Sequence, residues 1–512
     1  MRRALVTVAI VVLVTLVPGV SATAGPSATA GDRDFTFFGS GFGHGLGMSQ
    51  WGAYGLAQAG WTNARILAHF YSGTRVDRTQ QMPASLRIGL AQGKDKFRLE
   101  AEAGPVELHL GDPKTGDLVA KIPRGEMWTV RIADQAYKIL DASGSSVGNP
   151  VGGSGTDLFA VYEPNDARVK VPEALHTYSH GSIEFNLYNC QSNCTMRLVL
   201  TIDPEQYLYG LGEVPSSWPM EAMEAQAIAA RTYALRKADA GQHRSGCNCA
   251  LYASSYDQVY AGWDKEGGLD GNRWVNAVDN TKGRIATYRG EAIQAFYMSS
   301  SGGFTEDNEN VWGGTPIAYL RGVCDPGDYT SANPSAVWQS TFSAAQVTQD
   351  LGLGIGTVTG FDNVQRGVSG RITSATVTGE NGTANVSGST LRSALGLRDD
   401  RVWINKDRQV TGSIREKYDA MNCSPGLPTT RQVAVAGGAR QEFEDATIYQ
   451  SAGTGAHALD GAVLGHYLSQ GGPEGSLGFP ISDVRTMDNG NTRAAFEHGV
   501  VTCTSSGSCS VS

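Results

Sequence analysis

One segment organises this chain: Tyr207-Leu-Tyr-Gly-Leu-Gly-Glu-Val-Pro-Ser-Ser-Trp-Pro, followed directly by Met220-Glu-Ala-Met-Glu-Ala-Gln-Ala-Ile-Ala-Ala-Arg-Thr-Tyr-Ala. Pro219 suits the first turn of a helix, and no glycine or further proline interrupts the sequence until Gly241. Glu221 and Glu224 complement the positive end of a helix and are expected to be solvated first-turn charges. The sequence therefore predicts a long helix with an apolar methionine and alanine face, preceded by a loop that carries Glu213.

The flanking sequence predicts an α+β fold. Residues 86–202 contain short alternating runs separated by Gly, Asp and Pro, which is typical of a β-rich lobe. Upstream, the glycine- and aromatic-rich residues 35–74 are expected to form a loop followed by a helix near 62–71. Downstream, β-type runs at 291–297 and 371–378 surround a predicted helix near 343–351.

Both ends of the chain differ in composition from the centre. Residues 1–24 have two arginines, an apolar run and small residues for cleavage, which predicts a secretory signal peptide; an uncleaved anchor is the alternative. No other segment could span a membrane. We expect a linker at 25–34, the main domain at 35–406 with the β-rich lobe at 86–202 inside it, a linker at 407–438, and a repeat region at 439–512. In that region Arg440-Gln-Glu-Phe-Glu is echoed by Arg493-Ala-Ala-Phe-Glu.

The eight cysteines are even in number, and in an exported chain they predict disulfides. Cys190 and Cys194 bracket the turn between two alternating runs, as a staple across a β-hairpin would, and Cys503 with Cys509 could close the tail in the same way. The set His243, Cys247 and Cys249 lacks the paired motif of a zinc site, so disulfides are favoured there over metal.

Several blocks together resemble the SpoIID/LytB family of cell-wall enzymes. The quoted Glu213 segment resembles its signature, and three further blocks agree: Gly43-His-Gly-Leu-Gly-Met-Ser-Gln-Trp-Gly-Ala, Asp257-Gln-Val-Tyr-Ala-Gly, and Ser299-Ser-Ser-Gly-Gly-Phe-Thr-Glu with Val311-Trp-Gly-Gly. Ser369-Gly-Arg and Leu391-Arg-Ser-Ala-Leu-Gly-Leu resemble its closing block. In many members the Gly-His-Gly block follows the glutamate motif, whereas here it precedes it, which leaves open whether both blocks meet in one cleft.

The resemblance implies a lytic transglycosylase that cleaves the bond between N-acetylmuramic acid and N-acetylglucosamine and leaves a 1,6-anhydro end. This chemistry needs one carboxyl group that first gives and then takes a proton. A second carboxylate, usual in glycoside hydrolysis, is not required. Glu213 matches the family's catalytic glutamate. Leu211, Val214, Pro215 and Trp218 could bury it and raise its pKa, while the nearby helix start would lower it; helix capping is the alternative role.

The remaining site predictions are substrate-binding roles. His44, Ser49 and Gln50 could hydrogen-bond sugar hydroxyls, with a tight turn and a packed histidine as the alternative. Arg231 matches the family motif, but an ion pair is as well supported. The Ser-Gly-Gly block adds four candidates that could line the cleft or satisfy a turn: Tyr297, Ser299, Ser300 and Glu306. No metal and no cofactor is expected.

Composition limits the partners. The net charge is −9 with no basic run, which argues against nucleic acid, and the expected partners are peptidoglycan glycan strands and a cell-wall amidase. The tail segments Gly475-Ser-Leu-Gly-Phe-Pro and Phe496-Glu-His-Gly resemble the LGFP repeat, which implies a wall-binding or spacer module at a secreted, wall-associated protein. The rival functions are a non-catalytic activator of an amidase, as on the LytB side of the family, and a zinc amidase.

Overall fold

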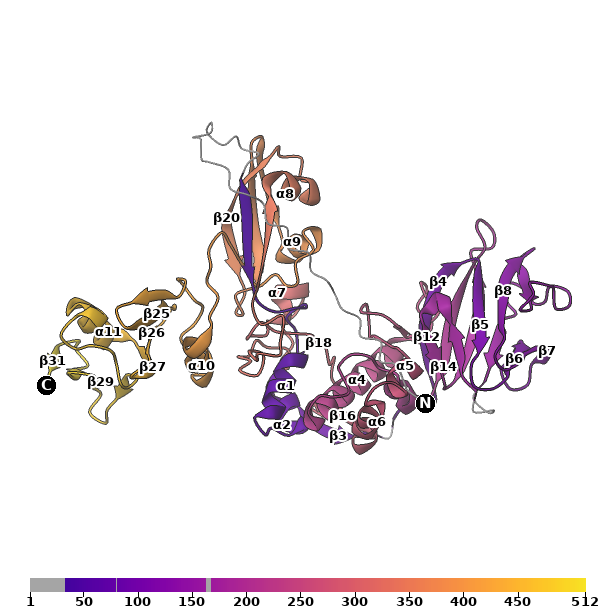
Figure 1. Ribbon diagram of the computed structural model, residues 1–512, viewed down its shortest axis with the longest axis horizontal. Coiled ribbons are helices and arrows are strands. Elements are labelled where there is room, and N and C mark those ends of the chain that lie inside the picture. The colour runs from indigo at the N-terminus through magenta and orange to yellow at the C-terminus, as the bar shows by residue number, and fades with distance from the viewer. Residues whose placement is uncertain (1–32, 80, 163–166) are drawn as a thin grey trace, which may run out of the picture.

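The computed structural model describes residues 33–79, 81–162 and 167–512 (Figure 1). The predicted signal peptide and the first part of the 25–34 linker lie outside the described residues. Helices and strands are mixed, as the α+β prediction required, and they fall into a β-rich lobe, a helical centre, a sheet unit covered by two helices, and a C-terminal module. Within the described ranges, no helix is long and apolar enough to cross a bilayer.

The β-rich lobe confirms the prediction for residues 86–202. It consists of a seven-stranded sheet, ordered β15-β4-β14-β13-β10-β6-β7, and a five-stranded sheet, ordered β12-β11-β5-β8-β9. The two sheets share one core, in which Phe97 and Phe185 meet edge to face with ring centroids 6.2 Å apart. The strands are β4 (Leu86–Lys94), β5 (Lys96–Ala101), β6 (Val106–Leu110), β7 (Asp117–Ile122), β8 (Met127–Ala133), β9 (Ala136–Leu140), β10 (Leu158–Val161), β11 (Val169–Val171), β12 (His176–Tyr178), β13 (Ser182–Tyr188), β14 (Thr195–Ile202) and β15 (Leu251–Tyr252), with the short helix η3 (Pro172–Ala174).

The helical centre forms around α4 (Met220–Ala240), which begins directly after Pro219 and ends at Gly241 as predicted. Its alanines let the neighbouring helices approach closely, because a small side chain keeps the backbones near each other. Glu224 differs from the prediction, because it is buried and accepts hydrogen bonds from Asn63 and Asn280. The surrounding elements are β2 (Met48–Ser49), α1 (Gln50–Gln58), α2 (Asn63–Phe70), β3 (Arg75–Arg78), α3 (Pro204–Tyr209), α5 (Trp263–Glu266), α6 (Gly271–Asn280), β16 (Arg284–Tyr288), β17 (Glu291–Ala292), β18 (Tyr297–Met298) and α7 (Asn308–Trp312).

The sheet unit corrects the prediction of a loop before residue 62. Residues 34–39 form strand β1, which pairs with β19 and β23 more than 300 residues away in sequence, and α1 follows. These pairings are long-range, so the local glycine-rich pattern does not reveal them. The predicted helix near 343 and the strand at 371 are present. The unit contains β1 (Asp34–Gly39), β19 (Trp338–Ser343), α8 (Ala344–Leu351), β20 (Val358–Arg366), β21 (Ile372–Gly379), β22 (Gly382–Val386), α9 (Gly388–Ala394) and β23 (Val402–Ile404).

The C-terminal module begins earlier than the sequence suggested. The 407–438 segment, expected as a linker, holds helix α10 and Cys423, which is bonded to Cys324 of the main domain. The predicted disulfides Cys190–Cys194 and Cys503–Cys509 are both present. The elements are α10 (Gly412–Ala420), β24 (Val433–Val435), β25 (Gly438–Glu442), β26 (Thr447–Ser451), β27 (Gly455–Leu459), α11 (Gly461–Ser469), η4 (Gly472–Glu474), β28 (Arg485–Thr486), β29 (Thr492–Phe496), β30 (Gly499–Cys503) and β31 (Cys509–Val511).

Candidate active site

Glu213 lies in the loop between α3 and α4, and a second loop holds this loop in place. The amide of Gly212 donates to the Val259 carbonyl at 2.9 Å, and Leu211 bridges to Tyr260. Gly210 permits this approach, because a Cβ atom there would stand 2.4 Å from the Tyr260 ring. The glutamate signature and the Asp257-Gln-Val-Tyr block therefore form one unit, and Glu213 sits at their junction.

The two carboxyl oxygens of Glu213 have different surroundings. Oε1 accepts a hydrogen bond from the Val259 amide at 2.7 Å and another from the Tyr297 hydroxyl at 3.1 Å. Oε2 accepts from the Gln50 amide at 3.4 Å, which is a long contact. These partners are donors, so a proton on this carboxyl group is best carried by Oε2, the less engaged oxygen.

Burial raises the pKa of Glu213, against the hydrogen bonds from Val259, Tyr297 and Gln50, which lower it. Burial outweighs these three hydrogen bonds, so the pKa of Glu213 lies above the ordinary value for a glutamate. Leu211, Val214 and Trp218 are buried around this loop as expected, whereas Pro215 is exposed and does not shield the carboxyl group. Glu213 therefore holds its proton more readily than an ordinary glutamate does.

Gln258 supports Tyr297 from behind and is a residue that sequence reasoning missed. Its amide nitrogen donates to the Tyr297 oxygen at 2.9 Å, and its amide oxygen accepts from the Tyr207 hydroxyl at 3.0 Å. Burial and the Glu213 charge raise the pKa of Tyr297 well above its usual value, so the phenol remains a donor. The sequence signal for Gln258 is its place in the Asp257-Gln-Val-Tyr block.

Gln50 shows that the Gly-His-Gly block and the glutamate block meet, which their order in the chain had left open. It belongs to the Gly-His-Gly block, yet its amide reaches both Glu213 and Gln226 at 3.4 Å. Strand β2, which leads into α1, lies parallel to β18 with Met48 opposite Tyr297. The Gly-His-Gly, glutamate and Ser-Gly-Gly blocks therefore meet around one carboxyl group, although they are far apart in the chain.

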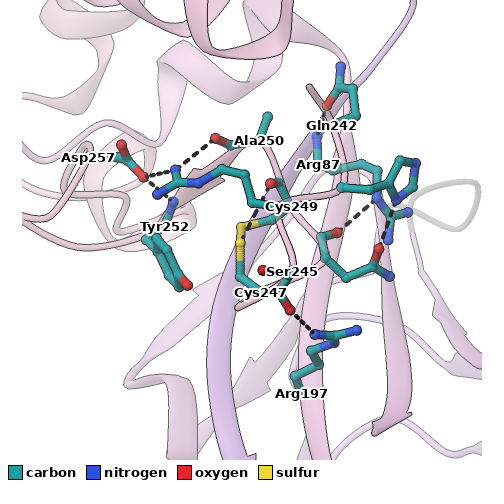
Figure 2. Close-up of a disulfide and its surroundings, with 12 residues drawn as sticks. Arg87, Arg197, Gln242, Ser245, Cys247, Cys249, Ala250, Tyr252 and Asp257 are labelled. Carbon is teal, nitrogen blue, oxygen red and sulfur yellow. Dashed lines mark hydrogen bonds and ion pairs between the residues drawn. A yellow bond between two sulfur atoms is a disulfide. The ribbon is translucent and has the colours of Figure 1, made fainter. Parts of the chain in front are cut away.

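The loop that carries Val259 is anchored through Asp257. This carboxylate accepts from the Tyr252 amide at 2.9 Å, pairs with Arg244 at 2.6 Å and with Lys237 at 2.9 Å. Figure 2 shows Asp257 and Tyr252 on one side of the disulfide between Cys247 and Cys249, with Arg197 on another. The segment closed by the Cys247–Cys249 disulfide thus helps to hold the loop in which Val259 contacts Glu213.

The region around Cys247 does not fit a zinc site. The two sulfur atoms are bonded to each other and both residues are buried, while the His243 ring is hydrogen-bonded to Asn248 at 2.8 Å. A zinc site needs free thiolates, which a disulfide does not supply. Among the described residues, the group Cys324, Asp419 and Cys423 also brings possible ligands together, and its two cysteines are likewise joined.

Four residues predicted to bind substrate instead form hydrogen bonds or ion pairs with other residues of the protein. Ser49 and Ser300 are buried and donate to Asp328 at 3.0 and 2.9 Å. Glu306 is buried and accepts from the Ser369 amide at 3.0 Å and from Asn310 at 2.9 Å. Arg231 is 0% exposed and pairs with Glu205 at 2.7 Å. Their polar groups are satisfied inside the fold, so they position the site and do not reach a ligand.

His44 is partly buried, in contrast to these four residues. Its Nδ1 accepts from the Leu46 amide at 3.0 Å, which fixes the ring. Burial, with the charges of Arg392 and Arg371, lowers the pKa of His44 to about 4, so the imidazole is neutral at pH 7. The ring lies 5.0 Å from that of Trp312, a residue not predicted for the site, which is 55% exposed. Ser299 is partly exposed, and its carbonyl accepts from Trp51 at 3.0 Å.

Two buried aspartates near Ser49, Asp325 and Asp328, make the free energy of unfolding depend on pH. Burial and the charge of Asp328 raise the pKa of Asp325 to about 8, and burial raises that of Asp328. A raised acid pKa means that the native state holds protons which the unfolded chain releases above about pH 4, so stability falls as pH rises toward 8. We expect Asp325→Asn to reduce this loss by about 1 kcal/mol per pH unit, measured by urea unfolding at pH 5, 6.5 and 8.

The exposed Asp350 supplies a matched control for this prediction. Asp350→Asn makes the same change of side chain at the surface and should leave the pH dependence of unfolding as it is in the unsubstituted protein. An Asp325→Asn protein whose stability still falls as steeply between pH 5 and pH 8 would contradict the account.

Comparison with known proteins supports the resemblance. Residues 192–288 match the family model for SpoIID, the stage II sporulation protein, and residues 426–475 match that for the LGFP repeat. Stage II sporulation protein D of Bacillus amyloliquefaciens is 32% identical over 229 residues, 42% of this chain and 63% of that protein. Its counterpart in Bacillus subtilis (strain 168) is 30% identical over 233 residues, 42% and 65%. The amidase enhancer of Bacillus subtilis (strain 168) is 34% identical over 142 residues, 28% and 17%.

These matches confirm the SpoIID and LGFP resemblances for the segments concerned. The SpoIID segment contains Glu213 and Val259, while the β-rich lobe before residue 192 lies outside it. The LGFP segment starts at residue 426, before the predicted boundary at 439. The chain spans less than two thirds of the length of each of these relatives.

Proposed function

We propose that this SpoIID-related chain is a peptidoglycan lytic transglycosylase in which Glu213 serves as both acid and base. The observation that carries the proposal is the asymmetric setting of one carboxyl group, with Oε1 held by two donors and Oε2 held by one long contact. Burial favours the protonated form that an acid catalyst needs. A single group of this kind suits a reaction that requires one carboxyl group.

The proposed reaction has two proton transfers at Oε2. In the first, Glu213 gives its proton to the glycosidic oxygen as the bond from that oxygen to muramic C1 breaks, and N-acetylglucosamine leaves with a free 4-hydroxyl. In the second, the Glu213 carboxylate takes the proton of the muramic 6-hydroxyl while its oxygen bonds to C1. The product is a 1,6-anhydro ring, and Glu213 regains its proton. Tyr297 and the Val259 amide stabilise the carboxylate between these steps.

Aromatic side chains near Glu213 suit a saccharide. Trp312 exposes much of its ring while it packs on Phe296 at 4.7 Å and on His44 at 5.0 Å. Helix α7 is held by the ion pair between Glu309 and Arg321, which anchors the backbone that carries Trp312. Sugars bind through apolar ring faces together with hydrogen bonds, and these contacts do not depend on the sign of the chain's net charge of −9.

The test is product analysis. The full chain without its predicted leader is incubated with intact and with amidase-treated peptidoglycan, and 1,6-anhydro muramic ends are measured by mass spectrometry. The proposal requires anhydro ends on at least one substrate and their loss in the Glu213→Gln protein. Free reducing ends, or no glycan products from either substrate, would overturn it.

A second function, activation of a cell-wall amidase, is favoured by the 34% identity over 142 residues to the protein named amidase enhancer. An activator would raise the rate at which an added amidase releases peptides and would make no anhydro ends. It would also keep this effect in the Glu213→Gln protein, because activation by binding does not need the proton. The same reaction mixtures therefore separate the two functions.

Tyr297→Phe should move the pH profile of the proposed enzyme. The Tyr297 hydrogen bond lowers the pKa of Glu213, so its loss leaves that pKa higher and keeps the acid protonated to a higher pH. We expect the alkaline limb of kcat/KM to move up by about one pH unit. Tyr137→Phe, in the β-rich lobe, is the matched control and should leave the limb in place. An unchanged limb in Tyr297→Phe would contradict the role given to this phenol.

The C-terminal module is proposed to hold the enzyme at the wall. The LGFP match at residues 426–475 supports a wall-associated protein, and secretion by the predicted signal peptide would bring the chain there. The module is tied to the main domain by the Cys324–Cys423 disulfide. Within the module, the ion pair between Lys417 and Asp483 joins α10 to the loop before β28.

A further inference from the structure

Helix α10 opens the C-terminal module but lies outside both matched segments, the SpoIID segment and the LGFP segment. In Figure 1 it lies between the rest of the module and the main domain. The Gly412 amide at its start donates to the Tyr329 hydroxyl at 3.2 Å, and the Cys324–Cys423 disulfide follows its end. The helix is therefore fastened on both sides to the segment that follows the Ser-Gly-Gly block.

Arg415 of α10 is buried against the Ser-Gly-Gly block. Its exposed fraction is 4%, and a Cβ atom at Gly303 would stand 2.3 Å from its Nη2 atom. The guanidinium lies over the Tyr329 ring at 5.1 Å, and its Nε donates to both carboxylate oxygens of Asp419 at 2.8 Å. Among the described residues, Nη2 has no hydrogen-bond partner. Apolar side chains in place of such a buried ion pair often preserve stability, so stability alone does not explain an arginine here.

The charge of Arg415 acts on two buried aspartates. Burial raises the pKa of both Asp325 and Asp328, and the charge of Arg415 lowers it. Asp328 accepts hydrogen bonds from the hydroxyl groups of Ser49 and Ser300, at 3.0 and 2.9 Å. These contacts suit a carboxylate, which only accepts hydrogen bonds. A cation in the same interior favours the carboxylate over the protonated form, whose own proton would compete with one of the serine hydroxyls.

Each of these two serines adjoins a residue that contacts Glu213. Ser49 is the N-cap of α1, and Gln50 is the first residue of that helix. Ser300 follows strand β18, which contains Tyr297. Gln50 and Tyr297 both donate to the Glu213 carboxyl group. A movement at the aspartate that binds both serines would therefore reach two of the donors that hold Glu213.

We infer that Arg415 is a positioning residue, which acts on Glu213 from helix α10. Its charge stabilises the Asp328 carboxylate, and this carboxylate holds the segments that carry Gln50 and Tyr297. Because Arg415 is buried, it does this without contact to a glycan. The inference rests on the proposed function, and it makes α10 a part of the catalytic unit.

The experiment replaces the ion pair as a whole, with Arg415→Met and Asp419→Leu together in the full chain without its predicted leader. Replacing Arg415 alone would leave Asp419 as a buried charge without its partner. We expect the double variant to unfold at a urea concentration no lower than the unsubstituted protein does, because the apolar pair fills the same space. Arg415→Lys, which keeps a positive charge near Asp328, is the second variant.

The kinetic readout distinguishes positioning from a merely structural role. In the double variant we expect kcat for anhydro-end formation to fall about tenfold with KM unchanged, since the acid is misplaced while the sugar contacts remain. The alkaline limb of kcat/KM should move up, because Gln50 and Tyr297 no longer lower the pKa of Glu213 as effectively. Arg415→Lys should leave this limb in place.

The tyrosines that face Glu213 do not supply this limb. Burial raises the pKa of Tyr207, Tyr233 and Tyr297, so all three phenols stay protonated through neutral and mildly alkaline pH. A shift of the limb therefore reports on Glu213 itself.

Hydrogen exchange measured by mass spectrometry tests the same link without any catalysis. The segments 46–52 and 297–303 should exchange about tenfold faster in the double variant, and the β-rich lobe should exchange as before. Arg98→Met with Glu173→Leu is the matched control, because it removes an ion pair of 2.8 Å from the β-rich lobe. This control should leave exchange of the two segments, the rate and the limb unchanged.

The two readouts let the two proposals fail separately. A stable double variant with unchanged exchange, rate and limb overturns the positioning role, and so does a limb that moves equally in Arg415→Lys. If the unsubstituted protein makes no anhydro ends, the transglycosylase fails and exchange alone decides. Faster exchange of the two segments then keeps Arg415 as the residue that holds them, and unchanged exchange removes it.

Discussion

Glu213→Gln is expected to lower the rate of anhydro-end formation by about 10³-fold, the range of a lost general acid and base. The amide cannot give a proton to the glycosidic oxygen or take one from the 6-hydroxyl. Its oxygen can still accept from the Val259 amide and the Tyr297 hydroxyl, so the loop between α3 and α4 keeps its contacts. The measurement is initial rate by mass spectrometry of the anhydro products.

Stability separates this outcome from misfolding. Burial raises the pKa of Glu213, so ionising it at neutral pH costs the native state free energy, and the neutral amide removes this cost. The variant should therefore unfold at the same temperature as the unsubstituted protein or a higher one at pH 7. Glu416→Gln, an exposed substitution on α10, is the matched control and should keep full activity. A Glu213→Gln protein that still makes anhydro ends at more than a tenth of the original rate would refute the assignment.

Local sequence patterns predict the parts of this fold that local forces specify. The alanine-rich run after Pro219 predicts α4 because proline and glycine bound it, and alternating residues predict the β-rich lobe. The pairing of β1 with β19 and β23 was not predictable, since no local feature of residues 34–39 indicates strands 300 residues away. The helix α10 was missed because the surrounding glycines, serines and prolines resemble a linker.

The site divides in a similar way. Motif resemblance selects Glu213, Gln50 and Tyr297, and the structure places Gln50 and Tyr297 within hydrogen-bonding distance of the Glu213 carboxyl group. Resemblance alone does not say whether a polar residue faces the ligand or supports the fold. Burial makes that distinction. Ser49, Ser300 and Glu306 lie in the interior and not on the surface that a ligand could contact. Gln258, which supports Tyr297, becomes visible only when the blocks are brought together.

Arg231→Met is expected to destabilise the chain by about 3 to 5 kcal/mol, because it leaves the partner of a buried ion pair uncompensated. Arg231 donates to Glu205 through Nε at 2.9 Å and through Nη2 at 2.7 Å, and it also donates to the carbonyls of Val278 and Arg284. Removing the guanidinium takes its donors away from the junction of α3, α4 and α6, and Glu205 then keeps the hydrogen bond from the Gly283 amide but has lost its charged partner. The measurement is urea unfolding at pH 7.

This prediction distinguishes the two roles that the sequence allowed for Arg231. If Arg231 is a structural residue, its substitution lowers the stability and leaves the glycan affinity of the folded protein unchanged. If it binds substrate, its substitution weakens glycan binding and leaves the stability unchanged. Arg124→Met, on the exposed surface of the β-rich lobe, should change stability by less than about 0.5 kcal/mol. A loss below about 1 kcal/mol in Arg231→Met, together with weaker glycan binding, would return Arg231 to the binding surface. The full burial of its side chain makes the structural role the one to expect, since no part of the guanidinium is open to a sugar.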